Sequence, residues 1–138
     1  MRVLVCGDRH WNSLDRTWTV LYGLHSLVPI TRLIEGEANG ADKLGRTFAE
    51  LNGIKVLPFP ADWTKFGKAA GPMRNEQMIR EGHPNLVIGF HNDIASSKGT
   101  KDMLKRAFLN EIPTRLVTDQ IIIDWTKDPI CDIILERR

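Results

Sequence analysis

Short, uniformly apolar runs alternate along the chain with longer segments in which apolar residues recur at helical spacing. The runs are rich in Val, Ile and Leu and lie at residues 3–6, 32–34, 54–57, 86–90 and 115–117. Each run is too short and too evenly apolar for an amphipathic helix. The pattern therefore predicts strands that are buried on both faces, as in a parallel sheet.

The segments between these runs carry residues at the spacing of one helix face. The residues that mark the four segments are Leu14, Trp18, Leu21 and Leu24; Leu44, Phe48 and Leu51; Met73, Gln77 and Met78; and Met103, Leu104, Ala107 and Phe108. Strands that alternate with helices imply right-handed crossovers between parallel strands. The sequence thus predicts an α/β fold: a Rossmann-like three-layer sandwich with a mainly parallel five-stranded sheet.

The alternation stops near the C-terminus. Residues 121–125 and 130–135 are apolar runs on either side of a Thr-Lys-Asp-Pro turn, which predicts a hairpin or an extension of the sheet edge. Such an extension could also cover a subunit interface. We expect one domain over residues 1–138, with a core of about 1–117 and a β extension of 118–138.

Composition narrows the class of protein. The chain has 138 residues, 42% of them hydrophobic and 26% charged, and no apolar run is long enough to cross a bilayer. The N-terminus lacks the features of a signal peptide, which predicts a cytoplasmic protein. Two isolated cysteines and four scattered histidines predict no disulfide and no metal site, and we expect no cofactor. A net charge of +2, with both signs mixed, argues against nucleic acid as a partner but leaves small anions open.

Ligands of open α/β sheets bind beyond the carboxyl ends of the strands, so the loops that follow the strands are the candidate site. After the first strand come Gly7, Asp8, Arg9 and Trp11. Arg9 suits a phosphate and Trp11 could stack on a ring. The alternative is that Asp8 pairs with Arg9 while Trp11 packs under the first helix.

The second strand leads into Gly36, Glu37, Asn39, Gly40 and Asp42. Two glycines four apart allow a close backbone approach, and the following helix N-terminus offers free N–H groups to an anion. The alternative is an ordinary tight turn in which Asn39 or Asp42 caps the helix.

The fourth strand leads into His91 and then Ser97, Lys98, Gly99 and Thr100. Hydroxyls, one ammonium and backbone N–H groups at the start of a helix could hold a phosphate. The spacing differs from that of a Walker A loop. A flexible surface loop is the alternative.

After the third strand, residues 63–70 predict a polar and aromatic loop, followed by a helix with Pro72 at its first position. Arg74 and Asn75 then fall in the first turn, where a cation opposes the helix dipole at a cost of up to about 1 kcal/mol. A bound anion would offset that cost, with Trp63 beside it. The alternative is a mobile lid without a specific partner.

Taken together, these loops resemble the YspA-like (YAcAr) family of the SLOG superfamily, which also contains the LOG phosphoribohydrolases and the DNA-processing protein DprA. The resemblance covers roughly residues 1–117 and rests on residues 7–9, 36–42, 60–63, 70–75 and 98–100. It implies a Rossmannoid domain that binds nucleotides or nucleotide-derived ligands. It also implies a homodimer or a higher homo-oligomer.

The chain departs from the family pattern in places that matter for chemistry. Glu37 and Asn39 stand where a Gly and an Arg are usual, and residues 92–97 replace a Gly-Gly pair. The position of the catalytic glutamate of LOG enzymes is Met103, whose thioether cannot replace a carboxylate in glycoside cleavage. Asp102 is adjacent but points about 100° away on a helix.

Three functions follow as hypotheses. The first is a sensor or sequestering protein for a nucleotide-derived small molecule, with phosphate on Arg9, Arg74 and Lys98 and with Trp11 or Trp63 stacking. The second is a nucleoside monophosphate phosphoribohydrolase, in which one of four acids replaces the missing glutamate: Asp8, Glu37, Asp42 or Asp102. The third is single-stranded DNA binding, for which aromatic and basic residues alternate at Trp11, Trp63, Lys65, Phe66 and Lys68.

Overall fold

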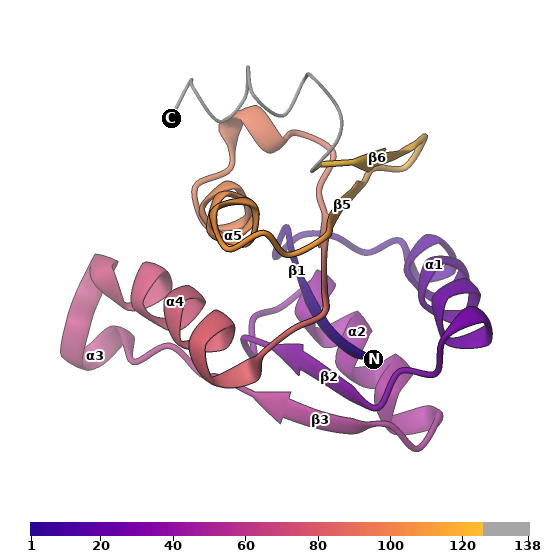
Figure 1. The fold of residues 1–138 in the computed structure, drawn as a ribbon. Helices are drawn as coiled ribbons and strands as arrows, with labels where there is room; N and C mark the ends of the chain where they lie inside the picture. Colours follow the sequence, from indigo (N-terminus) through magenta and orange to yellow (C-terminus); the bar gives the residue numbers. More distant parts are fainter. Residues whose placement is uncertain (126–138) are drawn as a thin grey trace.

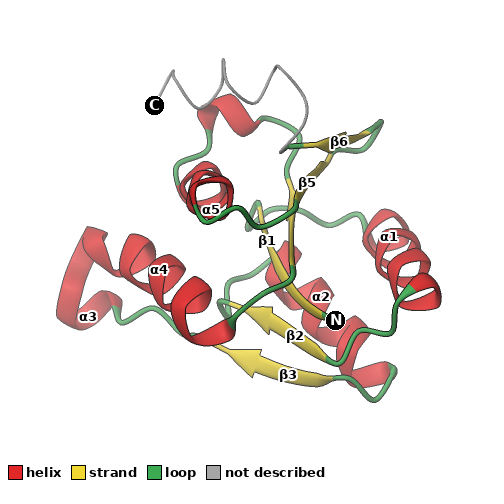
Figure 2. Ribbon diagram, viewed as in Figure 1, coloured by secondary structure: helices red, strands yellow, loops and turns green. Residues whose placement is uncertain are grey.

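The structure is a computed structural model that describes residues 1–125, and its centre is a six-stranded sheet, drawn in Figures 1 and 2. The strands are β1 (Arg2–Gly7), β2 (Arg32–Glu35), β3 (Lys55–Pro58), β4 (Leu86–Phe90), β5 (Thr114–Val117) and β6 (Ile122–Asp124). Their order is β3-β2-β1-β4-β5-β6; the first five are parallel, and β6 is antiparallel to β5. The predicted α/β, Rossmann-like sheet is confirmed.

Four main helices flank the sheet. They are α1 (Leu14–Leu27), α2 (Ala41–Leu51), α4 (Ala70–Gly82) and α5 (Gly99–Leu109). In Figure 1, α1 and α2 lie on one face of the sheet and α4 and α5 on the other. Each face has its own apolar core, with Leu21 and Phe48 in one, and Met78 and Met103 in the other. These are the three layers expected from the sequence.

The C-terminal extension is partly described. β6 pairs with β5, which confirms an extension of the sheet edge, and Trp125 after it is fully buried in the core on the α5 side. The second apolar run, at residues 130–135, and the turn before it lie outside the described residues.

The prediction of a loop at residues 63–70 is wrong. The segment is helical: α3 (Trp63–Phe66) is followed by a 3₁₀ turn over Gly67–Ala69 that runs directly into α4. The Asp62 carboxylate caps α3, since its Oδ1 accepts a hydrogen bond of 3.0 Å from the Lys65 N–H. Because Asp62 caps α3, the segment is helical where a loop was predicted.

The predicted start of α4, with Pro72 as its first residue, is also wrong. The helix begins at Ala70, so Pro72 is its third residue and Arg74 its fifth. Proline is tolerated there because the first four N–H groups of a helix have no partner within it. Arg74 thus lies beyond the first turn, where the dipole acts most strongly, and the argument that the dipole disfavours Arg74 no longer holds.

The order of the strands fixes where a ligand site is expected. The chain moves outward from β1 to β2 and β3, then returns to pair β4 with the other side of β1. At such a reversal the loops after β1 and β4 separate and leave a crevice at the carboxyl ends of the strands. Within residues 1–125, none of the helices has the length and apolar character needed to span a bilayer.

Candidate functional site

A cavity of about 490 Å³ opens at the carboxyl ends of β1 and β4. Eleven of the residues expected at the site line it: Gly7, Asp8, Arg9, Asp42, Arg74, Asn75, His91, Ser97, Lys98, Gly99 and Thr100. The loops after β1 and β4, the first turns of α2 and α5, and the α4 helix thus meet around one space. In particular, Arg9, Arg74 and the turn at 98–100 share it.

Two of the cations in the cavity have no protein partner among residues 1–125. Arg9 and Lys98 are exposed, and within residues 1–125 their side chains form no ion pair or hydrogen bond. The alternative in which Asp8 pairs with Arg9 is not what forms, because Asp8 Oδ1 accepts a hydrogen bond of 2.9 Å from the His10 N–H. Both cations therefore remain available to an anion.

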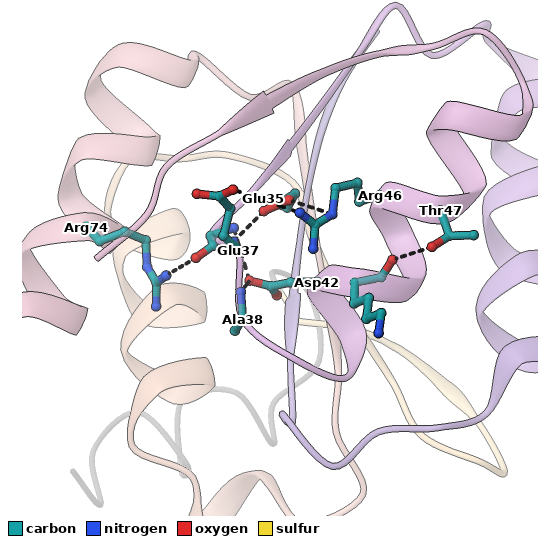
Figure 3. A network of polar contacts seen from close by, with 9 residues as sticks. Glu35, Glu37, Ala38, Asp42, Arg46, Thr47 and Arg74 are labelled. Atoms are coloured by element: carbon teal, nitrogen blue, oxygen red, sulfur yellow. Dashed lines mark hydrogen bonds and ion pairs between the residues drawn. The ribbon is translucent and has the colours of Figure 1, made fainter. Parts of the chain in front are cut away.

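Arg74, by contrast, is held in place by the loop after β2. Its Nη1 donates to the Gly36 carbonyl at 2.6 Å, and its Nε donates to Asn75 Oδ1 at 3.1 Å. A Cβ at Gly36 would lie 2.3 Å from that Nη1, so only glycine lets the guanidinium rest on this backbone. Figure 3 shows Arg74 reaching the loop from the side opposite Arg46.

Asn75 connects α4 to α5. It is buried, and its Nδ2 donates to the Gly99 carbonyl at 3.2 Å and to Asp102 Oδ2 at 3.0 Å. Because its oxygen already accepts from Arg74, the whole amide is used within the protein. Asn75 lines the cavity, but the structure gives it the role of positioning Arg74 and the start of α5.

The start of α5 is ordered by Ser97. Its Oγ accepts hydrogen bonds from the N–H groups of Thr100, at 3.1 Å, and of Lys101, at 3.4 Å. The N–H of Gly99, the first residue of the helix, has no partner within the described part of the chain. That group adds a hydrogen-bond donor to the cavity beside Lys98.

Asp42 links the loop after β2 to the cavity. The side chain is buried, and its Oδ2 accepts from the N–H groups of Gly36, at 3.0 Å, and Ala38, at 3.3 Å. Its Oδ1 accepts no hydrogen bond from residues 1–125. Burial raises the pKa of Asp42 to about 6, and the Ala38 N–H and the Arg74 charge limit the rise. Neither Asn39 nor Asp42 caps α2, whose N-cap is Gly40 without a side-chain bond.

Behind the loop lies a second buried acid that sequence reasoning missed. Glu35 is fully buried, accepts a hydrogen bond from the Glu37 N–H, and places Oε1 3.4 Å from Arg46 Nε (Figure 3). Burial is the main cause that raises the pKa of Glu35 to about 7. The signal was present in the sequence: an acid that directly continues an apolar strand.

The expectation that Trp11 stacks on a ligand is corrected by the structure. Trp11 is only 5% exposed, its Nε1 donates to Thr17 Oγ1 at 2.7 Å, and its ring centroid lies 5.6 Å from that of Phe90. The indole N–H therefore has its partner inside the core, and the ring is not free to stack on a ligand. The alternative, packing against the first helix, is what the structure shows.

The other expected residues lie beside the cavity. Gly36, Glu37 and Trp63 line an adjoining recess of about 360 Å³, which shares Ala38 and Arg74 with the main cavity. Asn39 and Gly40 line neither space; Gly40 instead packs against the backbone of residues 8 and 9.

Four residues line the main cavity that the sequence analysis did not assign to it: Cys6, Ala38, Met78 and Ser96. Met78 could have been found, because it lies one helical turn after Arg74 on the same face. Burial raises the pKa of the Cys6 thiol, so this group stays protonated and forms part of the apolar wall. Within residues 1–125, no group of three His, Cys, Asp or Glu residues could hold a metal ion.

The four carboxylates suggested as replacements for a catalytic glutamate do not all line one cavity. Asp8 and Asp42 line the main cavity, and Glu37 lines the recess. Asp102 is bound to Arg106 Nε at 2.8 Å and lies outside the cavity. Met103 is fully buried in the core.

The strand order defines a Rossmann-like α/β protein, and a cavity lined by Arg9, Arg74 and Lys98 lies where that order reverses. The model of the YspA, cpYpsA-related SLOG family matches residues 1–66. The Gene 61 protein of Mycobacterium phage D29 is 32% identical over 118 residues, which cover 81% of this chain and 92% of that protein. The chain belongs to the YspA, cpYpsA-related SLOG family, and this membership implies a nucleotide-related ligand in general terms.

Proposed function

We propose that this protein binds a nucleotide or nucleotide-derived molecule, by its phosphate and its ribose, in the cavity at the carboxyl ends of β1 and β4. One observation carries the proposal: two partner-free cations and an open carboxylate oxygen face the same space within the described structure. A sugar phosphate offers the matching groups, an anion at one end and hydroxyl donors at the other.

The phosphate is expected beside Arg9, Lys98 and the Gly99 N–H. Charge-assisted hydrogen bonds from guanidinium and ammonium groups to phosphate are stronger than neutral ones, and the N-terminus of α5 adds a favourable dipole. Neither cation has to give up a partner in the described structure, so phosphate binding breaks no existing ion pair.

The ribose is expected beside Asp42. Its open oxygen accepts hydrogen bonds but repels a phosphate, so the carboxylate fixes which end of the ligand lies there. The same residue holds the loop at 36–38 through its other oxygen, which makes the acceptor rigid. A preorganised acceptor loses little entropy on binding.

The cation half of the site is tested with ribose 5-phosphate in calorimetry at low salt. Arg9→Ala and Lys98→Ala are each expected to weaken binding about tenfold, because each removes a charge-assisted bond to phosphate. Lys55→Ala is the matched control, since this exposed lysine begins β3 at the opposite edge of the sheet and should leave affinity unchanged. Equal affinity in all three variants, or no binding by the folded wild type, would contradict the proposal.

The ribose half is tested by comparing ribose 5-phosphate with inorganic phosphate. Asp42→Asn should reduce the advantage of the sugar phosphate by about tenfold, because an amide cannot bond both the loop N–H groups and the sugar hydroxyl through oxygen. Affinity for inorganic phosphate should change little or rise slightly, since a repelling charge is lost. A parallel loss for both ligands would show that Asp42 only supports the loop.

The proposal is for binding without hydrolysis, as in a sensor or a sequestering protein. The buried Met103 stands where LOG enzymes have their catalytic glutamate, which favours binding over cleavage. Free base after long incubation with a nucleoside monophosphate would point to hydrolysis instead, with Asp8 or Asp42 as the acid. The homodimer implied by the resemblance stays a prediction that the molecular mass in solution would check.

A further inference from the structure

We propose that the recess beside the main cavity holds the base of the ligand, and that it selects a purine with adjacent N–H donors, as guanine has. This inference rests on the proposed function, because it places the second half of the same ligand. The recess has a volume of about 360 Å³ and lies between the start of α3 and the loop after β2.

The recess adjoins the main cavity. Both are lined by Arg74 and Ala38, so a ligand whose phosphate lies at Lys98 and whose ribose lies at Asp42 can extend past Ala38 into the recess. The bond from Arg74 Nη1 to the Gly36 carbonyl, at 2.6 Å, fixes the shared wall. A mononucleotide has this arrangement of three groups in a row.

Trp63 supplies a surface for a ring. Its side chain is 59% exposed although it is the largest apolar residue of α3, and its Cη2 lies 3.2 Å from where a Cβ at Gly71 would be. One part of the indole is thus supported by α4 while the rest faces outward. Pro60 and Ala61 complete the apolar side of the recess, and such a surface suits a flat heterocycle.

Glu37 supplies the polar side. Its backbone has φ of 56°, in the left-handed region that disfavours residues other than glycine, and its N–H is held by the buried Glu35. Its Oε1 lies 3.9 Å from Arg46 Nη1, near the upper limit for an ion pair. Backbone strain retained at a site rim is often functional. In the proposal, Glu37, which lines the recess, turns its two acceptor oxygens toward the base.

Two acceptor oxygens side by side match two N–H donors side by side. Guanine presents its ring N–H and its amino group on one edge, whereas hypoxanthine keeps only the ring N–H and adenine only the amino group. A carboxylate therefore discriminates among these bases, because the missing donor leaves an acceptor unpaired. GMP should bind more tightly than IMP or AMP.

The experiment measures affinities of GMP, IMP, AMP and ribose 5-phosphate for the wild type and four variants, by calorimetry. Wild type should bind GMP about tenfold more tightly than ribose 5-phosphate, through stacking and edge bonding. Trp63→Ala should remove most of that advantage without changing ribose 5-phosphate affinity. Phe66→Ala is the matched control: it removes an exposed ring from the same helix α3, outside the recess.

Base selection is tested by Glu37→Gln, which should reduce the preference for GMP over AMP about tenfold. Glu111→Gln is its control, because Glu111 is also exposed, has φ of 58° and lies beyond the end of α5, away from both cavities. If GMP and ribose 5-phosphate bind wild type equally, the recess holds no base and this inference is wrong, while the proposed function stands. If no compound binds, the proposed function fails as well.

Discussion

Replacing Gly40 with alanine is expected to lower the free energy of unfolding by about 3 kcal/mol or more and to remove ligand binding. Gly40 has φ of 71° and ψ of −123°, which residues with a side chain rarely adopt. A Cβ there would lie 2.3 Å from the Asp8 carbonyl oxygen and 2.5 Å from the Arg9 carbonyl carbon. Since both neighbours are backbone atoms, no side-chain rotation relieves the clash.

The loop after β1 cannot simply move away. The Asp8 carbonyl accepts hydrogen bonds from the N–H groups of Trp11, at 3.0 Å, and Ala41, at 3.2 Å. Displacing it breaks bonds to a buried aromatic residue and to the first residue of α2. It also shifts Arg9, one of the two cavity cations without a partner among residues 1–125, so affinity and stability should fall together.

Gly53→Ala is the matched control for this prediction. Gly53 has φ of 68°, but no atom of the described chain lies within 4 Å of an added Cβ, so its replacement should cost only the left-handed backbone energy, about 1–2 kcal/mol. The free energies of unfolding of both variants, measured with denaturant, separate the cost of backbone strain from the cost of the Cβ clash. If Gly40→Ala is no less stable than Gly53→Ala, the close approach of the two loops is not as described.

The second large effect is a dependence of stability on pH that comes from Glu35. Burial raises its pKa from 4.5 to about 7 in the folded protein, so the folded state binds a proton more tightly than the unfolded chain does. The resulting stability is fully present below pH 4.5 and is lost as pH rises through 7. The linked change is of the order of 3 kcal/mol, because each unit of pKa corresponds to about 1.4 kcal/mol.

Glu35→Gln should remove this dependence, because a neutral amide can still accept from the Glu37 N–H but does not titrate. Asp42 shifts stability in the same direction, over the interval from 3.8 to about 6. The loss between pH 6 and pH 8 therefore reports mainly on Glu35. Urea unfolding at pH 5, 6, 7 and 8 measures it.

The control for this experiment is Glu50→Gln, at an exposed position on α2, which should leave the pH profile of wild type intact. An unchanged profile in Glu35→Gln would mean that the ion pair with Arg46 at 3.4 Å keeps the buried carboxylate charged throughout. The conclusion that burial is the larger effect would then be wrong.

The strands were predictable because parallel strands are covered on both faces. Each is a short run of apolar residues that needs no long-range information to recognise, and β1, β2, β4 and β5 appear within about a residue or two of the expected positions. The same pattern also predicted that a site would lie at the carboxyl ends of the strands. Loops after parallel strands must gather at one edge, whatever their sequence.

The start of α4 was not predictable in this way. Gly71 and Pro72 favour a new helix locally, yet the Asp62 cap begins helical structure at residue 63 and the chain stays helical up to them. Two local signals for a helix start were present, and the Asp62 cap, which comes earlier in the chain, determined where the helical segment begins. The position of Arg74 in the helix changed as a result, although the residue still reaches the cavity.

The sequence by itself determined the elements, their order and the edge of the sheet where polar loops collect, because these depend on periodicity and chain direction. Only the tertiary structure decided that Trp11 is core, that Arg74 rests on Gly36 and that Asp42 keeps one oxygen open. Such assignments depend on which groups find partners across the fold. A residue's neighbours within a few positions do not determine whether its donors and acceptors are already used elsewhere.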